Sequence, residues 1–153
     1  MYRHILLPTD GSALSRKAVQ SAVHFARHIG ARLTGIHIMP VLHQVRLEAW
    51  LHHDPQYARR KKEFFEKRAN DYLAFIANSA LADEVPCVCK TVVAEEAHLG
   101  ILSEVWQGHC DLIFMASHGW SEIAKEVLGS ETQKVLRQSP VPVLVFRNPP
   151  ENT

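Results

Sequence analysis

The feature that most constrains this chain is the alternation of strand and helix signals along its whole length. Short apolar runs are separated by segments whose apolar residues recur every three or four positions, as they do on one face of a helix. The expected strands cover residues 5–7, 32–39, 85–94, 111–116 and 141–146. Such an alternation predicts an α/β domain with helices on both faces of a parallel sheet.

The helices between these strands are marked by their ends. The expected helices cover residues 18–29, 55–80, 99–106 and 130–138. Gly30 suits the C-terminal cap of the first helix, and Asp54 followed by Pro55 indicates the start of the second. The basic stripe on the second helix fits a solvated face, or a contact with an acidic partner. Residues 41–54 are ambiguous between a loop and an irregular helical turn.

The strand pattern also predicts where a ligand would bind. Residues 111–116 are apolar at consecutive positions, which is typical of a strand buried on both faces. Right-handed crossovers then favour a single-domain three-layer sandwich with the flavodoxin-like strand order 3-2-1-4-5. Ligands of such sheets bind at the carboxyl ends of strands one and four, where the winding direction reverses. We expect this domain to cover residues 1–147, with a flexible tail over residues 148–153.

The composition argues against several function classes. Among 153 residues, 17 are basic and 16 acidic, so a net charge of +1 offers no broad basic field for nucleic acid. No apolar run approaches the roughly 20 residues of a membrane helix, and no secretory signal is visible. The three cysteines cannot all pair, which fits a cytoplasmic protein. Neither a G-x-S-x-G motif nor a P-loop motif occurs, so serine hydrolase and P-loop functions have no support.

Two segments follow the strands that should border the ligand crevice. After strand one, Asp10 could accept hydrogen bonds from a ribose hydroxyl, or it could belong to a plain turn before a helix cap at Ser12. After strand four, Ser130 and Gln133 have capping-box spacing, which places a helix N-terminus directly after Gly129.

A helix N-terminus in this crevice would favour an anion. Its free N–H groups and its dipole attract phosphate, and Gly119 and Gly129 would allow the close approach of phosphate oxygens. The hydroxyls of Ser117 and Ser130 could add donors. The alternative is an ordinary loop that happens to contain glycine.

Five segments together form a recognisable pattern: residues 5–12 (ILLPTDGS), 35–38 (GIHI), 111–119 (DLIFMASHG), 128–130 (LGS) and 139–145 (SPVPVLV). In these segments the chain resembles the universal stress protein family, over nearly its whole length. The ATP-binding branch of that family has the pattern G-x2-G-x9-G-[ST]. Gly119, nine further residues and then Gly129 and Ser130 match its second half.

The resemblance implies a nucleotide site made of twelve residues: Pro8, Thr9, Asp10, Ile38, Met115, Ala116, Ser117, His118, Gly119, Gly129, Ser130 and Glu131. Asp10 would bind the ribose, Ile38 would frame the adenine together with the end of strand one, and Glu131 would offer its backbone N–H to phosphate. The ligand would be ATP, or AMP or ADP, with Mg²⁺ or Mn²⁺ bound through the phosphates.

The resemblance also implies a function and partners. The protein would be a nucleotide-dependent stress-response regulator and a homodimer formed through Val141–Phe146, with a protein partner that stays unknown. We expect no catalytic residues and at most slow ATP hydrolysis. The alternatives are an interaction module whose nucleotide site has decayed and a slow ATP hydrolase.

The chain departs from the family pattern at three places. Ala116 stands at the first glycine of the motif, and Glu131 stands where a small or apolar residue is usual. Residues 95–98 (EEAH) replace a turn that often contains glycine. They suit a charged helix start, or a metal site combining His98 with Cys87 or Cys89, although the two cysteines are also explained as small buried residues.

Overall fold

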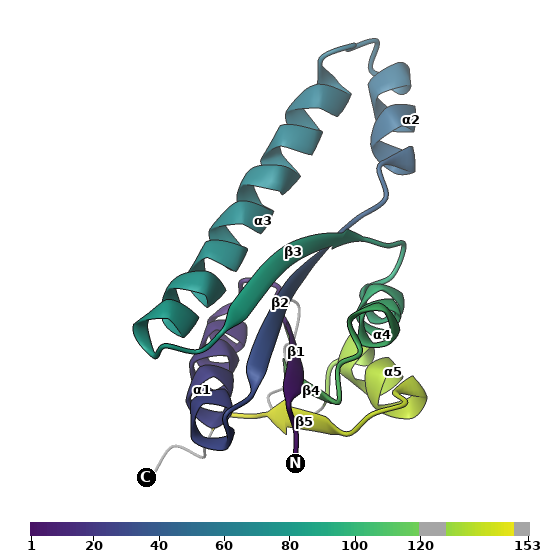
Figure 1. Cartoon of the computed structure of the whole chain (residues 1–153). Helices are drawn as coiled ribbons and strands as arrows, with labels where there is room; N and C mark the ends of the chain where they lie inside the picture. The colour runs from purple at the N-terminus through teal and green to yellow at the C-terminus, as the bar shows by residue number, and fades with distance from the viewer. Residues whose placement is uncertain (120–127, 149–153) are drawn as a thin grey trace, which may run out of the picture.

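The computed structural model describes residues 1–119 and 128–148, which form five helices and one five-stranded parallel sheet (Figure 1). In chain order the elements are β1 (His4–Pro8), α1 (Ala13–Ile29), β2 (Arg32–Met39), α2 (His43–Leu51), α3 (Tyr57–Ala82), β3 (Cys87–Val93), α4 (Ala97–Gly108), β4 (Leu112–Ala116), α5 (Ser130–Gln138) and β5 (Val143–Phe146). The strand order is β3-β2-β1-β4-β5, so the predicted order is confirmed.

Helices cover both faces of this sheet, as the alternation of elements predicts. Figure 1 shows α1 and α3 on one face and α4 and α5 on the other. The residues of β1 alternate between the two layers: Ile5 and Leu7 pack toward α1 and α3, and Leu6 packs toward α4 and α5. All three are fully buried, which explains why this strand is apolar at consecutive positions.

The segment between β2 and β3 is more helical than its sequence indicates. Residues 43–51 form the helix α2, and α2 and the first half of α3 extend away from the sheet as a hairpin (Figure 1). The Tyr57 hydroxyl donates a hydrogen bond to Glu48 at 2.7 Å, which joins the two helices. The helix α3 begins at Tyr57 rather than at Pro55, because the Asp54 carboxylate accepts the Gln56 N–H in a turn.

Several other predicted boundaries shift. The helix α1 begins at Ala13, five residues before the predicted start at residue 18. The strand β3 begins at Cys87 and β5 at Val143, later than residues 85 and 141. Residues 120–127, which fall inside the glycine motif, and residues 149–153 of the predicted tail lie outside the described residues. Within the described part of the chain, no helix has both the length and the apolar composition needed to cross a bilayer.

Candidate functional site

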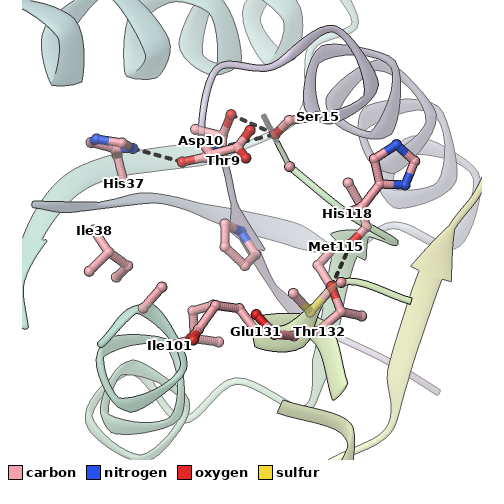
Figure 2. A pocket seen from close by; sticks show the side chains of 16 residues that line it. Thr9, Asp10, Ser15, His37, Ile38, Ile101, Met115, His118, Glu131 and Thr132 are labelled. Atoms are coloured by element: carbon pink, nitrogen blue, oxygen red, sulfur yellow. Dashed lines mark hydrogen bonds between the residues drawn. The ribbon is translucent and has the colours of Figure 1, made fainter. Parts of the chain in front are cut away.

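A cavity of about 330 Å³ opens at the carboxyl ends of β1 and β4 (Figure 2). It is lined by residues from three strands and from the first turns of α4 and α5: Pro8, Thr9, Asp10, Ser15, His37, Ile38, Ala97, Ile101, Met115, Ala116, His118, Gly119, Gly129, Ser130, Glu131 and Thr132. Eleven of the twelve residues predicted from the sequence are among them. The exception is Ser117, whose side chain is buried beneath the cavity wall.

The turn from β1 to α1 fixes Asp10 at the cavity. Its Oδ1 accepts the Ser12 N–H at 2.9 Å, and the Ser12 hydroxyl in turn caps α1 by accepting the Ser15 N–H at 3.2 Å. The expected Asp-Gly turn and Ser12 cap are therefore present, and they hold the Asp10 carboxylate at the cavity. Gly11 has φ +75, and a Cβ there would collide with the Tyr72 ring, so this turn requires glycine.

His37, on the neighbouring strand β2, forms a hydrogen bond with the end of β1. Its Nδ1 lies 2.8 Å from the Thr9 carbonyl oxygen (Figure 2), and because a carbonyl only accepts, Nδ1 must carry the proton. The ring also packs edge-on against Tyr72, with 5.1 Å between the ring centroids. The sequence predicts a satisfied, partly buried histidine at this position, but not that the histidine lines the cavity.

The opposite wall is built where β4 leads toward α5. The Ser117 carbonyl accepts the Gly129 N–H at 2.7 Å, and the Thr132 hydroxyl donates to the Ala116 carbonyl at 3.1 Å. These bonds place the N-terminus of α5 beside the end of β4. The predicted capping box is wrong: Gly129 is the N-cap, no side chain caps the helix, and the Gln133 amide donates to the Leu128 carbonyl. The first N–H groups of α5 have no partner within the helix and suit an anion.

The first departure from the family pattern, Ala116, is compatible with an open site. Ala116 has a negative φ, because it is not among the described non-glycine residues with positive φ, so its methyl group brings no backbone strain. Gly119 matches the motif, and a Cβ there would overlap the Asp10 carboxylate and displace it.

The second departure concerns Glu131, whose carboxylate has partners on α4. Its Oε2 accepts the backbone N–H of His98 at 2.7 Å and lies 3.0 Å from the His98 Nδ1, and its Oε1 lies 3.2 Å from the Lys134 ammonium. Burial would raise the pKa of Glu131, but the hydrogen bonds from His98 and Lys134 outweigh it and hold that pKa below its usual value.

The structure does not support a metal site that joins the cysteines to His98. Cys87 and Cys89 pack against the α1 and α3 layer, whereas α4, which carries His98, covers the other face of the sheet. Their sulfurs are 3.8 Å apart, and the hydrogen bond between them raises the pKa of the Cys87 thiol and lowers that of Cys89. The simpler interpretation, two partly buried thiols, is the one the structure supports.

The cavity combines three chemical environments. Ile38, Ile101 and Met115 supply apolar surface suited to a flat heterocycle, Asp10 supplies a carboxylate for hydroxyl groups, and the α5 N-terminus supplies backbone donors for an anion. This combination matches the parts of a nucleotide.

Comparisons with known proteins agree with this geometry. The model of the universal stress protein family matches residues 1–147. A protein of Staphylococcus aureus (strain USA300), named as a candidate universal stress protein, is 26% identical over 151 residues, covering 95% of this chain and 84% of the relative.

Two solved structures share the fold. The hypothetical protein MJ0577 has a TM-score of 0.79 at 23% identity, covering 97% of this chain and 98% of that one. A universal stress protein in complex with cAMP has a TM-score of 0.69 at 22% identity, covering 97% and 99% of the two chains. Because the family model matches nearly the whole sequence, this chain belongs to the universal stress protein family.

Proposed function

We propose that this protein binds an adenine nucleotide in the cavity between β1 and β4 and acts as a nucleotide-dependent regulator of the stress response. The nucleotide is ATP, with AMP and ADP as alternative occupants, and Mg²⁺ or Mn²⁺ accompanies the phosphates. The three free cysteines favour a reducing compartment, so we place this activity in the cytoplasm.

One observation carries the proposal: residues from five separate parts of the sequence converge on one cavity that ends at a helix N-terminus. The phosphates would lie over the first turn of α5, where backbone N–H groups and the helix dipole favour negative charge. The ribose hydroxyls would donate to Asp10, and the base would pack against Ile38 and Met115. The cAMP complex of a family member supports an adenine nucleotide as the ligand class.

The first experiment identifies the natural occupant. Freshly purified protein is denatured, and mass spectrometry determines which small molecule is released. Nucleotide-free protein is then heated with ATP, ADP or AMP. Binding to the native state alone adds about 2.7 kcal/mol at a hundredfold excess over Kd, which raises the melting temperature by roughly 2–8 °C.

Two variants locate the site. Asp10→Asn keeps the acceptor for the Ser12 N–H but removes the charge that would hold the ribose, so we expect at least a tenfold loss of affinity by calorimetry. Gly129→Val places a branched side chain at the N-cap of α5 and should abolish phosphate binding. Asp83→Asn, at the far end of α3, is the matched control. If none of the three nucleotides shifts the melting temperature, the site has decayed and the interaction module replaces this proposal.

A further inference from the structure

Two departures from the family pattern that lie far apart in the sequence meet in the fold. Glu96 and His98 stand at the start of α4, and Glu131 stands in the first turn of α5, 33 residues after His98. Their side chains form one group, here called the Glu96–His98–Glu131 cluster. The cluster adjoins the nucleotide cavity, because Ala97 and Glu131 are part of the cavity wall (Figure 2 labels Glu131).

The three ligand atoms of this cluster lie close to the spacing that a single metal ion requires. The His98 Nδ1 lies 3.0 Å from one oxygen of Glu131 and 3.2 Å from one oxygen of Glu96, and all three atoms lie within 4.8 Å of one another. Ligand atoms held at about 2.1 Å from one ion, at tetrahedral or right angles, are about 3.0–3.4 Å apart. Small movements of these side chains would bring the three ligand atoms into the coordination sphere of one ion.

Burial holds His98 in place, and a hydrogen bond holds Glu131. The His98 side chain is only 7% exposed, and its backbone N–H bonds the Glu131 carboxylate, so the imidazole and this carboxylate stay aligned. Glu96, by contrast, has a half-exposed side chain and reaches the cluster from solvent. An ion can therefore enter from the Glu96 side without any opening of the core.

The charge of the cavity supplies an independent reason for a cation. Among its described lining residues there are two carboxylates, Asp10 and Glu131, and neither lysine nor arginine. A phosphate chain would meet negative charge there, and a divalent ion bridging carboxylate and phosphate oxygens removes that conflict. Lys134, 3.2 Å from both Glu96 and Glu131, is the cation that balances the cluster in this structure. It is partly exposed on a flexible stem and can turn to solvent.

We propose that Glu96, His98 and Glu131 bind a divalent transition-metal ion of the Mn²⁺ kind at the rim of the nucleotide cavity. Two carboxylates and one imidazole suit Mn²⁺ better than Mg²⁺, which prefers oxygen ligands alone. The imidazole binds through Nδ1 in its neutral form, with its proton on Nε2. The remaining coordination positions face the cavity, where water or phosphate oxygens complete the sphere.

The test is a titration of nucleotide-free protein with Mn²⁺. The electron paramagnetic resonance signal of free Mn²⁺ measures how much of the ion stays unbound. We expect one equivalent of bound ion, which a tenfold excess of Mg²⁺ does not displace. Glu96→Gln and Glu131→Gln should each weaken binding at least tenfold. Glu95→Gln removes the same charge from the exposed neighbouring position and should change affinity less than twofold.

The outcomes of this experiment test the ion site independently of folding and of nucleotide binding. Because Glu96 is exposed, Glu96→Gln is expected to fold, and a melting curve verifies this for every variant. Equal Mn²⁺ binding by the parent protein and the Glu96→Gln, Glu131→Gln double variant would overturn the proposal, as would no binding by the parent. Since no nucleotide is present, either result leaves the proposed function standing, and a failure of nucleotide binding leaves the ion site standing.

Discussion

At the scale of single residues, Gly119 lies so close to the Asp10 carboxylate that no side chain fits between them. A Cβ on Gly119 would overlap the Asp10 carboxylate, although the backbone of Gly119 has no positive φ that excludes alanine. Gly119→Ala should therefore displace the Asp10 side chain without preventing folding. We expect at least a tenfold loss of nucleotide affinity by calorimetry, with little change in melting temperature. Gly108→Ala, remote from the cavity, is the control, and equal affinities for the two variants would contradict this prediction.

A second residue-scale prediction concerns His4, which is buried at the start of β1. Its Nε2 lies 2.6 Å from the Thr34 hydroxyl, and its Nδ1 faces the Arg32 guanidinium at 3.2 Å. Burial, and then the Arg32 charge, lower the pKa of His4 below 6.5. The folded state therefore holds His4 neutral, whereas the unfolded chain takes up a proton as the pH falls below 6.5.

The contribution of His4 to stability is therefore present above pH 6.5 and is lost as the pH falls below that value. Urea unfolding of the parent and of His4→Gln at a series of pH values measures it. The stability difference in favour of the parent should shrink between about pH 7.5 and pH 5.5. A difference that stays constant over this range would show that the two states of His4 do not differ in proton affinity.

At the scale of elements, two of the helices that border the cavity, α1 and α5, begin in different ways. The helix α1 has a side-chain cap, because the Ser12 hydroxyl accepts the Ser15 N–H, whereas α5 starts at Gly129 without one. Ser12→Ala should cost about 1 kcal/mol of unfolding free energy. Ser130→Ala makes the same chemical change on α5 and should cost far less. Urea unfolding without nucleotide measures the unfolding free energy that each variant loses. Equal losses would contradict a stabilising cap at Ser12.

The elements also show what sequence patterns can and cannot predict. The strand order and most helices follow from periodicity, because burial against one sheet imposes that periodicity. The helix α2 lacks such a signal: Leu47, Trp50 and Leu51 are exposed, and no side chain caps its start. Asp54 followed by Pro55 suggests a helix start, but the Asp54 side chain forms a turn there instead. The same residue types favour such a turn and a helix N-cap, so the sequence pattern does not distinguish the two.

At the scale of the whole molecule, contacts between segments far apart in the sequence determine which of the predicted sites form. Eleven of the twelve predicted lining residues meet because the strand order fixes where strand ends lie. The partnership of Glu131 with His98 could not be predicted, since it depends on how α4 and α5 pack side by side. The sheet separates His98 from Cys87, because α4 covers one face and Cys87 packs against the other.

The assembly of the molecule is the last prediction, and it concerns the outer edge of β5. The carbonyls of Pro142 and Phe146 accept hydrogen bonds from β4, so the alternate residues Val143 and Val145 direct their N–H and C=O groups away from the sheet. An apolar edge with such groups tends to pair. Pairing with a second copy about a two-fold axis would form the homodimer that we propose through Val141–Phe146.

The opposite edge, β3, offers a matched comparison. There the Pro86 carbonyl and the Ala94 N–H bond with β2, so the exposed Thr91 directs its N–H outward in the way that Val145 does. Its neighbour Lys90 is partly exposed and ion-paired with Glu104 of α4, and a lysine on an edge strand disfavours pairing. Because proline is tolerated where an N–H faces outward, Val145→Pro and Thr91→Pro should both fold.

Light scattering at roughly tens of micromolar protein distinguishes the two edges. We expect the parent and Thr91→Pro to be dimers and Val145→Pro to be a folded monomer, because only the last loses a donor from the paired edge. A monomeric parent would overturn the proposed dimer. A dimer that survives Val145→Pro but not Thr91→Pro would move the interface to β3. Neither result bears on the proposed nucleotide site, because the cavity lies at the carboxyl ends of the central strands, away from both edges.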